Sequence, residues 1–219
     1  MTAAPRFYGQ FNPPVDRVLY ERYFSNSTGQ GFFVECGAFD GQLQSSCKFF
    51  EESLGWRGIN IEASPPIYAQ LVRNRPLALN LHCALGATDG EVSFTHVLHP
   101  DYGENFGNGS IHHLESHRHE LLEQGCTFQE YTGIPLITYR HLMTMLGLTR
   151  PIALMVLDVE GGELDAIAGM VGSPALPQVL CVEIGHLGRQ SLIDALAPLG
   201  YRYDFESFVN AFFVRPAPQ

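Results

Sequence analysis

The chain has 219 residues, of which 45% are hydrophobic, and a chain of this length can bury an extensive core. Its 23 acidic and 13 basic side chains give a formal charge of −10, which argues against nucleic acid as a partner because binding a phosphate backbone requires a basic face. No run approaches the roughly 20 apolar residues of a membrane span, and the first residues lack the apolar core of a secretory signal. We expect a single cytoplasmic domain over residues 1–219, with a leading helical segment at 1–30.

The first predicted elements are a helix and a buried strand. Apolar residues at helical spacing over 14–24 predict the helix. The apolar run at 31–36 predicts the strand, which carries Glu35 near its carboxyl end and continues into a loop with Gly37 and Gly41. Glycine at these two positions permits a positive φ and a close approach of the backbone to a ligand.

The second predicted strand ends on a carboxylate. Residues 44–54 predict a helix that stops at Gly55, and residues 57–62 predict a strand that closes on Glu62. A helix over 65–74 follows, because its two prolines suit a first helical turn. A glycine loop after one strand and a carboxylate at the end of the next are typical of a nucleoside site, since the carboxylate can accept two hydrogen bonds from a ribose diol.

The glycine loop does not match the dinucleotide fingerprint Gly-x-Gly-x-x-Gly. The pattern from Glu35 to Gly41 is Glu-x-Gly-x-x-x-Gly, which places a carboxylate where a pyrophosphate would be bound. This charge favours a cationic ligand such as the sulfonium of S-adenosylmethionine and argues against NAD. A tight strand-to-helix turn without any ligand is the structural alternative.

Residues 98–133 interrupt the alternation of strands and helices. They contain many turn-forming residues and four closely spaced histidines. Because a long excursion in an α/β domain usually covers a site, we expect an insertion that forms a lid over an acceptor site, with Asn108, Ser110 and His113 as candidate substrate-binding residues. A zinc cluster is the alternative for the histidines, although no cysteine lies at ligand spacing.

The second half of the chain completes the predicted sheet. Residues 152–158 form an uninterrupted apolar run that is typical of a central parallel strand and ends on Asp158. The other strands are expected at 77–84, 91–97, 136–139, 178–183, 201–205 and 209–214, and the other helices at 140–147, 163–170 and 189–198. The last two strands predict an antiparallel hairpin at the sheet edge. The expected fold is an α/β three-layer sandwich around a mostly parallel, seven-stranded sheet.

The five cysteines are odd in number and widely spaced, and most of them lie in apolar runs. The sequence contains no Cys-x-x-Cys pair. This distribution predicts reduced cysteines buried in the core rather than a disulfide framework or a zinc site.

A series of motifs in a fixed order resembles the FkbM family of S-adenosylmethionine-dependent methyltransferases. The motifs are Phe33-Val-Glu-Cys-Gly-Ala-Phe-Asp-Gly41, Ser45-Ser-Cys, Glu51, Gly55-Trp-Arg-Gly58, Ile61-Glu62, Cys83-Ala84, and Leu157-Asp-Val-Glu-Gly161 followed by Glu163. The resemblance runs from about residue 10 to about residue 185. It implies a class I, Rossmann-like methyltransferase fold and methyl transfer to a hydroxyl, commonly of a sugar or a polyketide-like natural product.

The resemblance also implies roles for individual residues. The expected donor contacts are Glu35, Gly37, Ala38, Asp40, Gly41, Ser45, Glu62, Ala63 and Asp158, with Cys83, Ala84 and Leu85 beside the adenine. The chain departs from the family pattern at two places. Ser45-Ser46-Cys47 replaces the usual Ser-Asn-Thr, and Ala63 replaces the usual proline after the second-strand acid.

Methyl transfer to a hydroxyl requires a group that takes the hydroxyl proton, because an alcohol is a poor nucleophile at neutral pH. Asp158, at the carboxyl end of a central strand, is the first candidate for this base, with Glu160 beside it and His186 as a rival. Asp158 and Glu183 could instead bind Mg²⁺ or Ca²⁺, which would acidify and orient a sugar diol.

Two other functions stay open at this point. A nucleoside-binding or interaction module would keep the sheet and the donor affinity but would not depend on Asp158. An NAD-dependent oxidoreductase is opposed by the missing glycine and the acidic loop. The expected acceptor is a small molecule or a saccharide, and a homo-oligomer is not excluded.

Overall fold

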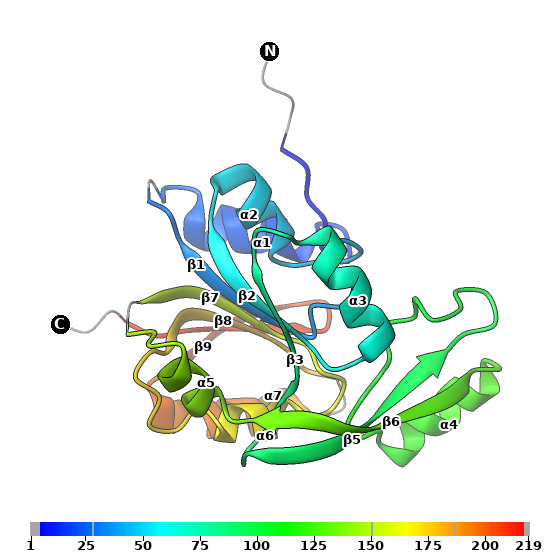
Figure 1. Cartoon of the computed structure of the whole chain (residues 1–219). Helices are drawn as coiled ribbons and strands as arrows, with labels where there is room; N and C mark the ends of the chain where they lie inside the picture. Colours follow the sequence, from blue (N-terminus) through cyan, green and yellow to red (C-terminus); the bar gives the residue numbers. More distant parts are fainter. Residues whose placement is uncertain (1–4, 28, 150, 186, 217–219) are drawn as a thin grey trace.

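Seven strands form the central sheet in the order β3-β2-β1-β7-β8-β10-β9 (Figure 1). The computed structural model describes residues 5–27, 29–149, 151–185 and 187–216. The strands are β1 (Phe32–Cys36), β2 (Arg57–Glu62), β3 (Leu79–His82), β7 (Ile152–Leu157), β8 (Pro177–Glu183), β9 (Arg202–Ser207) and β10 (Asn210–Val214). Neighbouring strands are parallel except at β10, which is antiparallel to both β8 and β9. This order with one reversed strand is the class I methyltransferase topology, so the predicted fold class is confirmed.

Helices cover both faces of the sheet and complete a three-layer sandwich (Figure 1). One face carries α1 (Val15–Leu19), a π-helical turn (Tyr20–Phe24) and α2 (Lys48–Leu54). The other carries α5 (Tyr139–Met145), α6 (Glu163–Ala168) and α7 (Arg189–Leu196), which is followed by a 3-10 turn (Ala197–Leu199). The helix α3 (Pro65–Asn74) packs beside β2 and β3. No helix in the described part of the chain is both long and apolar enough to cross a lipid bilayer.

The central strands are mostly apolar because both of their faces are covered, and the buried Glu35 in β1 is an exception. In β1, Phe33 joins the core under α1 and α2, while Val34 and Cys36 join the core on the opposite face. Successive side chains of a strand point to opposite faces, so a strand between two helical layers needs apolar residues at every position. The continuous runs in the sequence therefore identified β1, β7 and β8 correctly.

A second, three-stranded sheet extends from the main one (Figure 1). Its order is β4-β6-β5, and its strands are β4 (Ala84–Leu85), β6 (Thr127–Ile137) and β5 (Gly90–Leu98). The helix α4 (Glu115–Glu123) packs on it through Leu121. The strand expected at 77–84 is divided, because β3 stays in the main sheet while the chain crosses to the second sheet at Cys83.

The strand β6 begins inside the excursion expected at 98–133. It has 11 residues, and the strand expected at 136–139 is only its end. Most side chains of its first half are exposed or half-buried on both faces, so the sequence shows no apolar alternation there. Antiparallel pairing with β5 makes this polar segment a strand.

Backbone hydrogen bonds at Cys36 and Gly37 join the carboxyl ends of β1, β2 and β7, and we call this point the backbone crossing. The Asp158 amide donates to the Cys36 carbonyl over 3.0 Å. On the other side, the Gly37 amide donates to the Ile61 carbonyl over 3.0 Å. Gly37 has a φ of +78°, and a Cβ at this position would lie 1.6 Å from the Asp158 carbonyl oxygen. Only glycine fits both the left-handed conformation and the close contact.

We expect Gly37→Ala to lower the free energy of unfolding by more than about 4 kcal/mol or to prevent folding, because the added methyl group overlaps backbone that cannot move away. The matched control is Gly55→Ala. Gly55 also has a positive φ, +67°, but a Cβ there would meet nothing within 4 Å. The control should therefore lose only about 1 to 2 kcal/mol from its conformation. Urea unfolding measures the free energy of unfolding of both variants. Equal losses of this free energy in the two variants would contradict the role of the backbone crossing.

Candidate functional site

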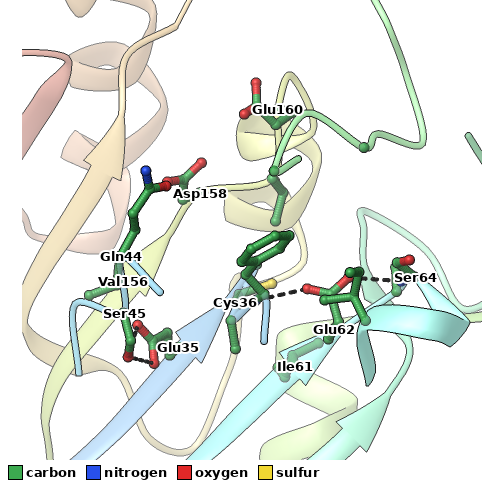
Figure 2. Close-up of a pocket in the computed structure, with 18 of the residues that line it drawn as sticks. Glu35, Cys36, Gln44, Ser45, Ile61, Glu62, Ser64, Val156, Asp158 and Glu160 are labelled. Carbon is green, nitrogen blue, oxygen red and sulfur yellow. Dashed lines mark hydrogen bonds between the residues drawn. The ribbon is translucent and has the colours of Figure 1, made fainter. Parts of the chain in front are cut away.

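A cavity opens at the carboxyl ends of β1, β2 and β7 (Figure 2). It encloses about 1080 Å³ of empty space, part of which is open solvent. Its walls come from the strand ends, from the loop after β1, from β5 and from residues of the excursion after β5. A pocket at the carboxyl ends of parallel strands is where open α/β sheets bind their ligands.

Most of the predicted donor-binding residues lie together in this cavity. Those that line it are Glu35, Gly37, Ala38, Ser45, Glu62, Ala63, Cys83, Ala84 and Asp158. The predicted catalytic residue Glu160 lines it as well. The sequence motifs therefore predicted residues that the structure brings together in one pocket, and their binding roles stay predictions.

Three predicted donor contacts lie outside the lining. Asp40 accepts hydrogen bonds from the Gln42 and Leu43 amides at 2.8 and 2.7 Å, which shapes the loop. Gly41 has a φ of +73° and packs against the buried Arg75, whose Cγ would lie 2.5 Å from a Cβ. Leu85 belongs to the main core. Asp40 and Gly41 therefore shape the loop beside the cavity, and Leu85 packs in the core next to it.

Glu35 is held by the protein itself. One carboxylate oxygen accepts from the Ser46 amide over 2.7 Å and from the Cys47 amide over 3.1 Å. The Ser45 hydroxyl also donates to this carboxylate, and Arg75 forms an ion pair with it at 3.3 Å. Burial raises the pKa of Glu35, while Arg75 and these hydrogen bonds oppose the rise. The charge of Glu35 is thus compensated by Arg75, and the same contacts explain why α2 begins at Lys48 rather than at residue 44.

Glu62 keeps a carboxylate in the cavity that can accept further hydrogen bonds. One of its oxygens accepts from the Phe39 amide over 3.0 Å and the other from the Ser64 amide over 2.8 Å (Figure 2). Each carboxylate oxygen has two lone pairs, so two acceptor positions stay available for a ribose diol. Burial raises the pKa of Glu62 from 4.5 to about 7 because the charged form loses its hydration.

Three carboxylates meet at the ends of β7 and β8. Ligand oxygens of Asp158, Glu160 and Glu183 all lie within 4.8 Å of one another. In the described part of the chain, none of the three forms an ion pair with a basic side chain. Burial, together with the charge of Asp158, raises the pKa of Glu160 to about 8 and that of Glu183 to about 10. The cluster therefore retains protons at neutral pH in the free protein.

The loop that carries Glu160 is held in an unusual conformation. Glu160 has a φ of +56°, which is uncommon for a residue with a side chain. The Glu163 carboxylate accepts from the Val159 amide and from the Gly161 amide, each at 3.1 Å. The Ser110 hydroxyl donates to the Glu160 carbonyl over 2.7 Å. Backbone strain of this kind often accompanies functional sites, where neighbouring contacts maintain it.

The candidate substrate-binding residues Asn108, Ser110 and His113 lie beside the cavity but do not line it. The Asn108 carbonyl and the His113 ring nitrogen Nε2 are 2.7 Å apart, which is a hydrogen-bond distance. This contact joins two parts of the excursion to each other. The excursion instead contributes Phe106, Gly107, Gly109 and Ile111 to the lining.

The predicted metal and base residues divide between two places. Among the described residues, one group of three or more acids, histidines or cysteines has the spacing of metal ligands, and it is the carboxylate cluster. The histidines of the described residues form no such group. The predicted metal ligand Glu183 belongs to this cluster and lines a smaller adjoining cavity with Glu160. The rival base His186 lies outside the described residues. The five cysteines are free and buried, as predicted.

Sequence analysis missed two residues on the wall formed by the second sheet. Phe94 and His96 lie on the same face of β5 and both line the cavity. His96 is 2% exposed, and its Nδ1 lies 3.1 Å from the Ser64 hydroxyl. The alternation within residues 91–97 predicted the strand, but no pattern in the sequence indicates that this strand faces the glycine loop after β1.

The raised pKa of Glu62 predicts a pH dependence. A carboxyl whose pKa is higher in the folded than in the unfolded chain stabilises the fold fully below pH 4.5, and this contribution is lost as the pH rises through about 7. Between these limits the loss amounts to about 3 kcal/mol. The Glu62→Gln variant should therefore lose less stability than the wild type between pH 4.5 and 8 in urea unfolding. Glu91→Gln, which changes an exposed acid on β5, should keep the wild-type slope, and equal slopes for all three proteins would contradict the assignment.

Comparisons with known proteins identify the family of this chain. A family model described as the methyltransferase FkbM domain matches residues 35–203, which is most of the chain. A comparison with curated protein sequences gives no match.

Solved structures give distant matches. The ribosomal protein L11 methylase of Lactobacillus delbrueckii subsp. bulgaricus is 11% identical over 92% of this chain and 76% of its own, with a TM-score of 0.43. A TehB-like SAM-dependent methyltransferase of Corynebacterium glutamicum is 11% identical over 96% and 89%, with a TM-score of 0.44. The human methyltransferase 10 domain containing protein is 11% identical over 91% and 76%, with a TM-score of 0.43. On the strength of the family match over residues 35–203 and the sheet order, the chain belongs to the FkbM family of S-adenosylmethionine-dependent methyltransferases.

Proposed function

We propose that this methyltransferase transfers its methyl group to a hydroxyl of a sugar or of a glycosylated small molecule. The observation that carries the proposal is the carboxylate cluster of Asp158, Glu160 and Glu183 beside the nucleoside cavity. A hydroxyl acceptor needs a proton acceptor, and sugar diols are commonly held by carboxylates. The cluster supplies both.

The residues of the cavity fit S-adenosylmethionine, which supplies an activated methyl group on a sulfonium when bound. The Glu62 carboxylate can accept the two ribose hydroxyls, and Cys83 and Ala84 form an apolar, buried wall for the adenine. Gly37 allows the end of β1 to contact the Asp158 backbone, which keeps Glu62 and Asp158 in the wall of the same cavity. The acids of the cluster favour a positively charged ligand through the low dielectric of the site.

Asp158 is the member of the cluster suited to take a proton. Its negative charge, together with burial, raises the pKa of Glu160 to about 8 and that of Glu183 to about 10, so these two acids hold protons at neutral pH and leave Asp158 as the proton acceptor. Asp158 lies at the end of the central strand β7 and lines the cavity, which places it between donor and acceptor in this proposal. We therefore assign Asp158 as the base, with Glu160 as its neighbour.

The same oxygens fit a divalent metal. Three carboxylates within 4.8 Å offer the hard oxygen ligands that Mg²⁺ and Ca²⁺ prefer. A metal there would compensate charges that have no basic partner in the described part of the chain, and it would acidify an acceptor hydroxyl. Asp158 and Glu183 are the proposed ligands.

The remaining assignments rest on composition. A formal charge of −10 supports a small-molecule or saccharide acceptor rather than a nucleic acid. The free, buried cysteines support a reducing compartment such as the cytoplasm. A binding module without turnover is the second candidate, because it too would keep the Glu62 cavity.

We expect Asp158→Asn to lower kcat about 100-fold or more while the affinity for S-adenosylhomocysteine changes by less than about threefold, because the amide keeps the shape of the side chain but cannot take a proton. Calorimetric titration measures the affinity, and release of S-adenosylhomocysteine with a panel of saccharide acceptors measures turnover. Asp194→Asn, an exposed acid on α7, is the control. A wild type that binds the product nucleoside but methylates no hydroxyl acceptor would support the binding module instead. Binding of NAD without binding of S-adenosylhomocysteine would refute the donor assignment.

We expect millimolar Mg²⁺ or Ca²⁺ to raise the thermal unfolding midpoint by about 3 °C at pH 8, because a cation that binds only the folded chain stabilises it. Glu183→Gln removes one proposed ligand and should abolish the rise, whereas Glu91→Gln should keep it. An equal rise in the Glu183→Gln variant would show that the ions bind elsewhere. No rise in the wild type would leave the cluster as a base without a metal.

A further inference from the structure

One buried side-chain atom in the cavity wall has no hydrogen-bond partner among the described residues. His96 on β5 is 2% exposed and lines the cavity, and this atom is its Nε2. Buried polar atoms are nearly always hydrogen-bonded, because leaving one unsatisfied is costly. An unsatisfied nitrogen in the wall of a ligand cavity indicates that the ligand itself supplies the partner.

The Ser64 hydroxyl fixes which role this nitrogen plays. Ser64 is 2% exposed, and its hydroxyl oxygen lies 3.1 Å from His96 Nδ1. Among the described residues this hydroxyl has no other hydrogen-bond partner, and we assign it as the donor to Nδ1, because a hydroxyl that accepted from Nδ1 would leave its own proton without an acceptor. A neutral imidazole that accepts at Nδ1 carries its proton at Nε2. His96 therefore presents an N–H donor, and its ligand must present an acceptor.

The position of His96 decides which part of the ligand it can reach. The Ser64 amide donates to the Glu62 carboxylate over 2.8 Å, so the chain of contacts runs from Glu62 through Ser64 to His96. In Figure 2, Ser64 lies on the side of Glu62 that faces away from Asp158 and Glu160. A nucleoside whose ribose binds Glu62 and whose reacting end points to Asp158 therefore has its base toward His96.

The surroundings of His96 also fit a nucleobase. Phe94 shares the face of β5 with His96 and lines the cavity, and Ala63 and Ile67, which are neighbours of Ser64 in the sequence, also contribute apolar surface to the lining. A flat heterocycle needs an apolar slot with a small number of polar groups that fix its orientation. His96 is the polar group in this part of the wall.

We propose that the His96 Nε2–H donates a hydrogen bond to a ring nitrogen of the donor's adenine, so that a residue of the second sheet sets the nucleobase specificity of this enzyme. The inference rests on the proposed donor site, with the ribose at Glu62. His96 acts here as a binding residue and has no part in the methyl transfer itself.

Calorimetric titration of the wild type with S-adenosylhomocysteine and with its 1-deaza, 3-deaza and 7-deaza analogues tests the proposal, since each analogue lacks one ring nitrogen. We expect one analogue to bind about tenfold more weakly than the parent, which is the worth of one hydrogen bond to a buried group. Equal affinity for all four ligands would overturn the assignment of His96. Failure of the wild type to bind S-adenosylhomocysteine at all would overturn the proposed function as well, so the two failures are distinguishable.

The variants His96→Leu and His96→Gln complete the test. His96→Leu should bind S-adenosylhomocysteine about tenfold more weakly and should no longer discriminate against the analogue that the wild type rejects. His96→Gln retains an N–H at a similar position and should recover part of the affinity. Wild-type affinity in a folded His96→Leu protein would refute the inference and leave the methyltransferase assignment intact, and His119→Leu, an exposed histidine on α4, is the control.

Discussion

The site depends on the backbone crossing at the carboxyl end of β1. The chain after β1 is bound on one side to β7, through the Asp158 amide, and on the other to β2, through the Ile61 carbonyl. A Cβ on Gly37 would overlap the Asp158 carbonyl, so the two strand ends approach as closely as peptide groups can. This contact places Glu62 and Asp158 on either side of one cavity.

The buried acidic groups fall into two sets, those that form an ion pair with a buried arginine and those that form no ion pair among the described residues. Glu35 has the buried Arg75 as its ion-pair partner, and Arg75 also pairs with Glu51 at 3.0 Å. This network holds Glu35 at the floor of the cavity and orders the turn at Ser45. Glu62 and the carboxylate cluster form no ion pair with a basic side chain of the described residues, and burial raises the pKa values of these acids. A charged ligand or metal is therefore favoured at the second set of acids and not at the first.

The second sheet turns the excursion into a wall of the site. Its strand β5 carries Phe94 and His96 toward the cavity, and the loop after β5 returns to pair with Thr95 through Ser110. Ser110 then donates to the Glu160 carbonyl, so the same loop supports the carboxylate cluster. One element therefore both carries His96 in the cavity wall and supports the loop of Glu160.

The sequence by itself determined the strands, the glycine loop and the acids at the strand ends. These signals are local, because a buried parallel strand needs a continuous apolar run and a left-handed turn needs glycine. It also predicted that Glu62 and Asp158 would meet, since parallel strands end at the same edge of a sheet. Only the tertiary structure decided that Arg75 pairs with Glu35, that the polar segment from Thr127 is a strand, and that His96 lines the cavity. Those three facts depend on contacts between segments far apart in the chain, and no pattern within a single segment records them.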